Sequence, residues 1–359
     1  ERKRGIVIDV PILLATISIA VLGFIILYSA VGENSSMVLR QVLRFGLALM
    51  VFGILSQVSP RLLRIWSPWI FCITLVFLLM VMLKGEMGGG AQRWLDIGII
   101  RFQPSEIMKI SVPMMVAWFM HERPLPPTFM QLLILLLIFC VPTFLIYQQP
   151  DLGTALLVMF SGGFTVLLAG LSIRLIAILG VFSLSCIPVL WSYMFDYQRA
   201  RVLTFLDPES DPLGAGYNII QSKIALGSGG LFGKGWLNGT QSHLEFLPER
   251  STDFIFAVMG EEFGLLGLLF LLGLYLLLVG RGLYIASQAQ DTFTRLLAGG
   301  LSLTFFVYVF VNSGMVSGLL PIVGVPLPLV SAGGTSMVTL MAGFGILASI
   351  HGNRKFLAP

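Results

Sequence analysis

The sequence has little charge for its length. Asp, Glu, Lys and Arg make up 11% of its 359 residues, whereas 56% of the residues are hydrophobic. A soluble globular domain carries about 25% charged residues, so this chain has more apolar surface than a water-soluble core can bury. The composition excludes a soluble globular protein and predicts an integral membrane protein.

Cysteine and histidine are equally scarce, with three residues of each. The cysteines lie in apolar runs, far apart in the chain: Cys72, Cys140 and Cys186. The histidines are also scattered: His121, His243 and His351. Without short spacings between them, neither a disulfide framework nor a zinc site is indicated, and a Ser/His/Asp triad is not indicated either.

Long apolar runs, in contrast, occur along the whole chain. A helix needs about 20 apolar residues to cross a bilayer, and ten segments meet that length. They lie at 10–31, 38–57, 65–83, 104–120, 129–147, 152–170, 173–194, 253–280, 292–318 and 331–350. No internal repeat or linker divides them, so we expect an all-α polytopic protein with one membrane domain over residues 1–359.

An even number of spans places both ends on the same side of the membrane. The ends read ERKRG and HGNRK, and the short connections on that side contain further basic residues: Arg61, Arg64, Arg123, Arg174 and Arg281. The short connections on the other side, at 32–37, 148–151 and 319–330, have no Lys or Arg. The positive-inside rule therefore predicts that both termini are cytoplasmic. The basic start resembles a signal peptide, but its 22-residue apolar run and the nine further spans favour an uncleaved first helix.

Two external loops, 84–103 and 195–252, hold most of the polar sequence. The second lies between the seventh and eighth spans and contains GSGGLFGKGWLNGTQ. Such glycines either cradle a phosphate with open backbone N–H groups or permit tight turns. The sequence leaves both interpretations open.

Charged residues within the spans are costly, at about 3 kcal/mol each near the centre of the membrane. Glu106 and Lys109 lie in the outer turns of the fourth span, and their spacing of three places them on one face, where they can pair. We expect them to line a polar cavity. Arg40 and Arg44, at the outer start of the second span, either face the same cavity or reach to lipid phosphates.

The eighth span begins with an acid, Asp253, and contains two more, Glu261 and Glu262. Its 28 residues would measure about 42 Å as a helix, against about 30 Å for the hydrocarbon core, so Asp253 is expected at or above the outer headgroups. Asp253 either caps the helix or faces the cavity. The two glutamates indicate a buried polar network, and they also suit a proton or ion path.

Four blocks of the sequence are distinctive: GGGAQRWLDIGIIRFQPSEIMKI, QPDLGTALL, DPESDPLGAGYNIIQSKIALGSGGLFGKGWLNGTQSHLEFLPERSTDFIFAVMGEEFG and GLLPIVGVPLPLVSAGGTS. In their content and their order along the chain, these blocks resemble the SEDS family (shape, elongation, division and sporulation proteins). The portion PLGAGYNIIQSKIALGSGG is similar to the elongation member rather than the division member. The resemblance implies a peptidoglycan glycosyltransferase of the bacterial cytoplasmic membrane. Such an enzyme polymerises lipid II into glycan strands at the outer face of that membrane, for cell elongation and rod shape.

The same resemblance implies roles for individual residues. The family's essential acid lies in the TDF motif, which is Asp253 here, and its polar cavity pair lies in the PSExxK motif, which is Glu106 and Lys109 here. The chain departs from the family pattern at two positions: Ser251 replaces a usual His, and Ala332 replaces a usual Tyr. These departures leave the local contacts open.

Polymerising a lipid-linked sugar requires a base for the acceptor hydroxyl and positive charge for the departing pyrophosphate. We assign the base to Asp253. The candidates that neutralise the pyrophosphate are Lys109, Arg44, Arg93 and Arg101, and Glu106 is a further candidate for binding the substrate. No tightly bound cofactor is expected, but a divalent cation (Mg or Mn) is an additional candidate for the pyrophosphate, with ligands that the sequence does not place.

Two other functions compete with a polymerase. A lipid II flippase would also use buried charges, and a scaffold would need no chemistry. The short, basic internal loops favour the polymerase, because a flippase needs polar access from both faces. The resemblance further implies partners: a class B penicillin-binding protein (a transpeptidase), other membrane proteins of the elongation complex and membrane lipids. No nucleic acid is expected.

Overall fold

The computed structural model describes residues 8–88, 91–96, 98, 101–212, 216–243 and 246–353. The helices are α1 (Val10–Ala30), α2 (Ser35–Gln57), α3 (Pro60–Lys84), α4 (Pro104–Met120), α5 (Phe129–Gln148), α6 (Leu152–Leu168), α7 (Ile173–Ser185), α8 (Ile187–Tyr193), α9 (Asp196–Leu206), α10 (Tyr217–Gly229), α11 (Thr240–His243), α12 (Ile255–Ser287), α13 (Thr292–Val316) and α14 (Thr335–Gly352). A small antiparallel sheet of order β1-β2-β3 follows α3, with β1 at Glu86–Gly88, β2 at Ala91–Asp96 and β3 at Arg101–Phe102. A 3-10 turn, Pro208–Ser210, follows α9.

Seven of the described helices are long and apolar enough to cross a membrane: α1, α2, α3, α5, α12, α13 and α14. The prediction of an all-α polytopic membrane protein is therefore confirmed. The count of ten spans stays a prediction, because α4 and α6 have 17 residues each. In addition, the predicted span 173–194 is divided at Cys186 into α7 and α8, of 13 and 7 residues.

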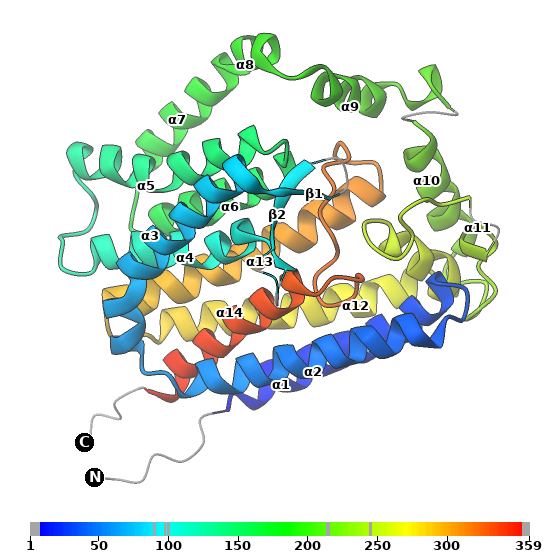
Figure 1. Cartoon of the computed structure of the whole chain (residues 1–359), viewed down its shortest axis with the longest axis horizontal. Helices are drawn as coiled ribbons and strands as arrows, with labels where there is room; N and C mark the ends of the chain where they lie inside the picture. Colours follow the sequence, from blue (N-terminus) through cyan, green and yellow to red (C-terminus); the bar gives the residue numbers. More distant parts are fainter. Residues whose placement is uncertain are drawn as a thin grey trace.

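The long helices pack in a bundle in which α2 contacts α14, α1 contacts α12, and α13 contacts α6, α4 and α12. Close approach needs small residues. At Gly345 in α14, an added Cβ would lie 2.7 Å from the carbonyl oxygen of Phe52 in α2. The start of α1 and the end of α14 lie at the same end of the bundle, whereas α7 and α8 form an arc that projects away from it (Figure 1). The basic residues at 1–5 and 354–355, on which the predicted orientation partly depends, lie outside the described residues.

Several helices begin where the sequence supplies a polar cap. The side chains of Asp9, Asn34, Asp151 and Asp291 accept hydrogen bonds from backbone N–H groups in the first turns of α1, α2, α6 and α13. In the absence of such a cap, α3 and α4 begin with a proline in the first turn, where no N–H is needed.

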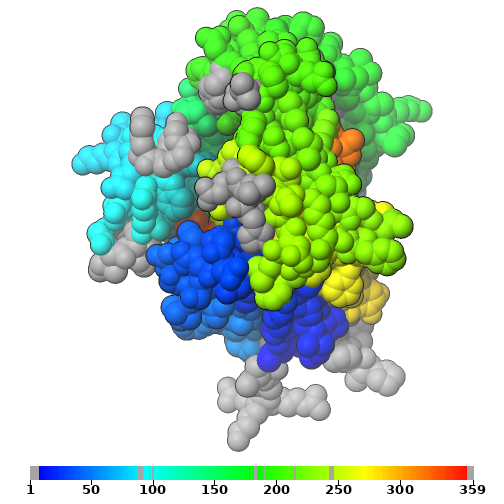
Figure 2. Space-filling model, turned by 90° about the vertical axis from the view of Figure 1, so that its right-hand side faces the viewer, coloured from blue at the N-terminus to red at the C-terminus, as the bar shows by residue number. Residues whose placement is uncertain are grey.

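The segment predicted as an external loop, 195–252, forms more secondary structure in its described residues than the sequence indicates. It contains α9, α10 and α11, and α10 packs along the first half of α12. Figure 2 looks onto this end of the molecule, where the α1–α2 connection (blue), the segment after α3 (cyan) and α9–α11 (green to yellow-green) are all visible at the surface.

The glycine-rich stretch packs against a break in α12. At Gly264 the backbone leaves helical geometry, with φ +65° and ψ −166°. The N–H of Leu265 then donates to the carbonyl of Gly230 at 2.9 Å, and the N–H of Lys234 donates to the carbonyl of Glu261 at 3.0 Å. An added Cβ at Gly233 would lie 2.1 Å from the carbonyl oxygen of Glu262. The tight-turn interpretation is confirmed here, because the glycines allow backbone to approach backbone.

Candidate active site

A cavity of about 740 Å³ opens between the sheet, α4, α6, α9 and the start of α14. Its polar lining includes Arg93, Gln103, Glu106, Asp151, Thr154, Arg201, Glu249, Thr252, Asp253, Tyr308, Thr335 and Ser336. Apart from Tyr308, the lining comes from loops and helix ends that the sequence analysis assigns to the outer face. The cavity therefore collects polar groups from one end of the bundle.

Asp253 lies in the turn that precedes α12 and lines this cavity. It does not cap the helix: the N-cap residue is Phe254, and no side chain bonds to the first turn. Among the described residues its carboxylate has no hydrogen-bond or ion-pair partner. Burial raises the pKa of Asp253 from 3.8 to about 6, with a further rise from the charge of Glu249.

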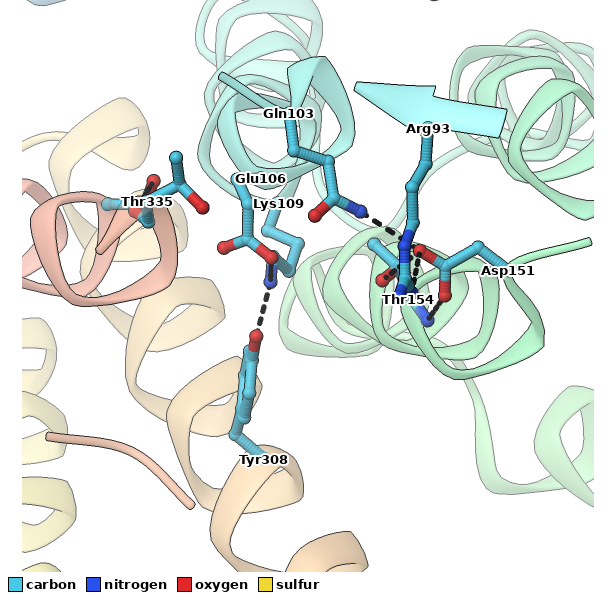
Figure 3. A network of polar contacts seen from close by, with 9 residues as sticks. Arg93, Gln103, Glu106, Lys109, Asp151, Thr154, Tyr308 and Thr335 are labelled. Carbon is cyan, nitrogen blue, oxygen red and sulfur yellow. Dashed lines mark hydrogen bonds and ion pairs between the residues drawn. The ribbon is translucent and has the colours of Figure 1, made fainter. Parts of the chain in front are cut away.

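Two arginines oppose this rise. Arg93 and Arg201 both line the cavity, and their positive charges lower the pKa of Asp253. Arg93 extends from β2 toward Asp151, with 3.6 Å between its Nη1 and Oδ2 of Asp151 (Figure 3). Oδ2 of Asp151 also accepts hydrogen bonds from Gln103 and Thr154, each at 2.9 Å. Asp151 thus orients Arg93 at the cavity wall.

The predicted pairing of Glu106 with Lys109 is confirmed. Lys109 Nζ donates to Glu106 Oε1 at 2.7 Å and to the hydroxyl of Tyr308, and it lies 4.4 Å from the centre of that ring (Figure 3). Both charged residues are buried, at 6% and 5% exposure. Glu106 and Tyr308 line the large cavity, whereas Lys109 lies behind them and borders a small apolar pocket that includes Phe305 and Leu301.

Glu106 keeps one oxygen available. Its Oε2 is buried and has no hydrogen-bond partner among the described residues. A buried acceptor without a donor is costly, so this atom suits a hydrogen bond from a bound molecule.

Arg101 and Arg44 do not line the cavity. Arg101 is exposed, lies 3.5 Å from Glu86 and stacks at 5.2 Å over the ring of Trp94. Arg44 is also exposed and lies beside the start of α14, where an added Cβ on Gly334 would be 3.4 Å from its Nε. Arg40 is exposed as well. The structure therefore brings Asp253, Glu106 and Arg93 together and places Arg44 and Arg101 outside their cavity.

The buried network predicted for the two glutamates of α12 is confirmed. Glu261 is fully buried, and its carboxylate accepts hydrogen bonds from Lys234 Nζ at 2.7 Å, from the N–H and hydroxyl of Thr240 at 2.9 Å each, and from the N–H of Gln241 at 3.1 Å. Glu262 accepts a hydrogen bond from the hydroxyl of Ser29 in α1. These bonds fix the glycine-rich segment and α1 to the first half of α12.

Ser251 and Ala332, the two departures from the family pattern, are neighbours. The N–H of Ala332 donates to the carbonyl of Ser251 at 2.8 Å, so the two positions meet through their backbones beside Asp253.

Sequence reasoning missed Asp151, Arg201 and Tyr308. For Asp151 a signal existed, because an acid three residues before Thr154 at the start of an apolar run is typical of a helix N-cap. Arg201 and Tyr308 carry no local signal that sets them apart from neighbouring residues.

All three cysteines are free. Within the described ranges, no three His, Cys, Asp or Glu side chains lie close enough to hold a metal ion, and the side chain of His243 is outside this description.

Comparisons with known proteins agree on one family. A family model for the FtsW, RodA and SpoVE proteins, described as "Cell cycle protein", matches residues 8–356. The chain is 54% identical over 352 residues to the peptidoglycan glycosyltransferase MrdB of Escherichia coli K12, covering 98% of this chain and 95% of the relative. It is 35% identical over 368 residues to the probable peptidoglycan glycosyltransferase FtsW of Trichlorobacter lovleyi, covering 98% and 94%.

Solved structures give the same result. One, described as a peptidoglycan synthase complex that coordinates polymerization and crosslinking, contains a chain with a TM-score of 0.83 and 33% identity, covering 96% of this chain and 97% of that one. The rod shape determining protein RodA of Thermus thermophilus has a TM-score of 0.72 and 29% identity, covering 96% of each chain.

Proposed function

Because the chain belongs to the SEDS family of FtsW, RodA and SpoVE, we propose that it is a peptidoglycan glycosyltransferase that polymerises lipid II for cell elongation. The observation that carries the proposal is the environment of Asp253. An acid without a partner among the described residues, with a pKa of about 6, lies beside two arginines in a 740 Å³ cavity. Perturbed acids in cavities are typical of active sites.

In the proposed reaction, Asp253 is the general base. Its carboxylate takes the proton of the 4-hydroxyl of the acceptor GlcNAc, and the hydroxyl oxygen attacks the anomeric carbon of the donor MurNAc. The bond from that carbon to the pyrophosphate breaks on the opposite face, so the configuration inverts. A base with a pKa of about 6 is largely deprotonated at neutral pH and still accepts a proton readily.

In this proposal Arg93 and Arg201, which line the cavity, neutralise the departing polyprenyl pyrophosphate. Guanidinium groups bind phosphate oxygens well because they offer several donors in one plane. Arg201 takes the role that the sequence analysis gave to Arg101, since Arg201 lines the cavity and Arg101 does not. Glu106 Oε2 is available to accept a hydrogen bond from a sugar hydroxyl or amide.

A divalent cation remains an expectation from the chemistry. The described residues offer no cage of three ligands, although Mg²⁺ often binds through one or two carboxylates together with substrate phosphates. The proposal therefore assigns no step to a cation. Measuring the polymerisation rate against Mg²⁺ and Mn²⁺ after treatment with a chelator tests this expectation.

We further propose ten membrane crossings, cytoplasmic termini and a cavity that faces the periplasm. This topology is supported by the shared end of α1 and α14 in the bundle (Figure 1). Cysteines introduced at Glu33 and at Glu122, in a cysteine-free background, test it in whole cells. A membrane-impermeant maleimide should label the Glu33→Cys variant and leave the Glu122→Cys variant unlabelled; the reverse result contradicts the topology.

A class B penicillin-binding protein is the proposed partner. The structural relative described as a polymerisation and crosslinking complex supports an association of this kind. We expect the partner to be required for full activity or to increase it, so the assay is made with and without it.

The decisive experiment compares polymerisation with flipping in one preparation. Purified protein in liposomes with lipid II should produce glycan strands on a denaturing gel, and Asp253→Asn should abolish them. Asp196→Asn is the matched control, because Asp196 is a fully exposed acid on α9. Lipid II flipping without glycan synthesis would favour the transporter, and glycan synthesis by Asp253→Asn would remove Asp253 from the mechanism.

A further inference from the structure

Three successive carbonyl groups in the turn that carries Asp253 each accept a hydrogen bond, either from the segment before α14 or from α13. Ala332 N–H donates to Ser251, the Ser331 hydroxyl donates to Thr252, and the Asn312 amide donates to Asp253. We propose that Asn312, supported by Ser331, is a positioning residue that holds the catalytic turn. This inference rests on the proposed role of Asp253 as the base.

The Asp253 carboxylate is not held by contacts of its own. No described residue donates a hydrogen bond to it or forms an ion pair with it. Its position therefore depends on the backbone of residues 251–253. Hydrogen bonds that fix this backbone also fix the position of the Asp253 side chain. They leave the carboxylate oxygens available for the substrate.

The side-chain amide of Asn312 donates hydrogen bonds to two backbone segments: the turn that carries Asp253 and the loop that contains Val325. It is fully buried in α13, and its Nδ2 donates to the carbonyl of Asp253 at 2.9 Å and to the carbonyl of Val325 at 2.7 Å. Val325 follows Gly324, which has φ +71° and borders the base: an added Cβ there would lie 3.5 Å from Asp253 Oδ2. Asn312 thus sets the distance between the catalytic turn and the loop that faces its carboxylate.

Ser331 supports the same arrangement from the other side. Its hydroxyl accepts a hydrogen bond from the N–H of Leu327 at 2.7 Å while donating to Thr252. Its carbonyl in turn accepts a hydrogen bond from Gln41 in α2 at 3.0 Å. The catalytic turn is therefore connected to α13, to the segment before α14 and, through Ser331, to α2.

The test measures initial polymerisation rates against lipid II concentration for Asn312→Leu, Ser331→Ala and a control. Asn312→Leu keeps a similar volume and removes both donated hydrogen bonds. Ser313→Ala is the matched control, because the Ser313 hydroxyl donates only to carbonyls of its own helix, at 2.8 and 3.3 Å. Displacing a reacting group by about 1 Å costs about 100-fold in rate.

We expect Asn312→Leu to lower kcat about 100-fold, with KM for lipid II within about threefold of that of the unaltered protein. Ser331→Ala should give a smaller fall of the same kind, and Ser313→Ala should give none. A kcat for Asn312→Leu equal to that of the control overturns the proposal. So does a matching loss of lipid II affinity, because a generally loosened site would produce it.

Folding and the identity of the base are checked separately. Thermal unfolding and gel filtration show whether Asn312→Leu folds; if it does not, Ser331→Ala decides by the same criterion. Asp253→Asn in the same assay separates the two proposals. If that variant keeps its activity, the assignment of the base fails, whereas a dead Asp253→Asn beside a fully active Asn312→Leu removes only the positioning role.

Discussion

Asp253, in the turn before α12, and Glu261, in the second turn of α12, are two acids eight residues apart with opposite surroundings. Around Glu261 the glycine-rich segment supplies an ammonium, a hydroxyl and two backbone N–H groups. Around Asp253 the described residues supply no donor to the carboxylate. Glu261 is therefore held by hydrogen bonds within the protein, whereas the carboxylate of Asp253 is available to a molecule in the cavity.

The difference shows how a membrane protein can separate stability from reactivity. A buried charge is tolerated when its partners replace the lost hydration, and Glu261 meets that condition. No described residue donates a hydrogen bond to the buried carboxylate of Asp253, and burial raises the pKa of this acid to about 6. A site that only had to be stable would not need such an acid, so this contrast favours a chemical role for Asp253.

The largest expected effect comes from replacing each acid by its amide. Asp253→Asn should lower polymerisation by about 100-fold to 10,000-fold, which is the contribution typical of a general base. Its stability should rise. The folded pKa of about 6 exceeds the unfolded value of 3.8, so the stabilisation from proton binding is complete below pH 3.8 and lost above pH 6. At pH 7.5 the amide should gain about 1–3 kcal/mol, measured by thermal unfolding.

Glu261→Gln is the matched exchange, with the opposite result expected. It should lower the unfolding temperature, because the amide leaves Lys234 without its carboxylate, while the folded fraction retains polymerase activity. A stable but inactive Glu261→Gln would mean that the two acids share one function, and the contrast between them would fail.

The sequence alone predicts those features of the fold and the site that depend on neighbouring residues in the chain. The boundaries of α4 and α5 follow from their apolar runs and first residues, and the Glu106–Lys109 pair follows from a spacing of three on a helix. The sequence distinguishes Asp253 by its place as the first residue of an apolar span and by the TDF motif.

The remaining features depend on contacts between distant segments. Arg93 and Arg101 lie in adjacent strands, and only the packing of the sheet against α3 and α4 decides which of them meets the cavity. The break in α12 at Gly264 likewise requires the glycine-rich segment, more than 20 residues earlier, to supply the missing carbonyl partners. No window of sequence contains both halves of such an arrangement.

The second prediction concerns the partner of Glu261. Lys234→Met should destabilise the protein by about 2–3 kcal/mol. Breaking a fully buried ion pair typically costs about 3–5 kcal/mol, and the loss here should be smaller because Lys234 is 29% exposed and the other donors to Glu261 remain. Lys84→Met, an exposed change at the end of α3, is the control. Equal unfolding temperatures for the two variants would show that the donors of Thr240 and Gln241 suffice for Glu261.

The third prediction compares two arginines of the small sheet, Arg93 in β2 and Arg101 in β3. Arg93→Met should lower kcat/KM for lipid II by about 10-fold to 100-fold, because it removes about 1.5–3 kcal/mol of charge-assisted hydrogen bonding to the pyrophosphate. Arg101→Met should change it by less than about threefold, since Arg101 is half exposed and lies outside the cavity. If both variants were equally impaired, the pyrophosphate would have to bind across the whole sheet rather than within the cavity.

The smallest expected effect is a shift in pH dependence. Polymerisation requires the deprotonated base, so its rate should fall as the pH drops through about 6. The charge of Glu249 raises the pKa of Asp253, whereas Arg93 and Arg201 lower it and Asp151 raises it. Glu249→Gln removes one raising charge and keeps an oxygen for the bond from the Thr252 hydroxyl, which is 2.7 Å long in the unaltered protein.

The acidic limb of the Glu249→Gln profile should therefore move to lower pH by a fraction of a unit, so that this variant retains more of its maximal rate at pH 5.5. Glu33→Gln, an exposed change between α1 and α2, should leave the limb in place. A shift toward higher pH would reverse the sign expected from a negative neighbour. It would mean that the group titrating in the profile is not the acid beside Glu249, which would place the base elsewhere in the cavity.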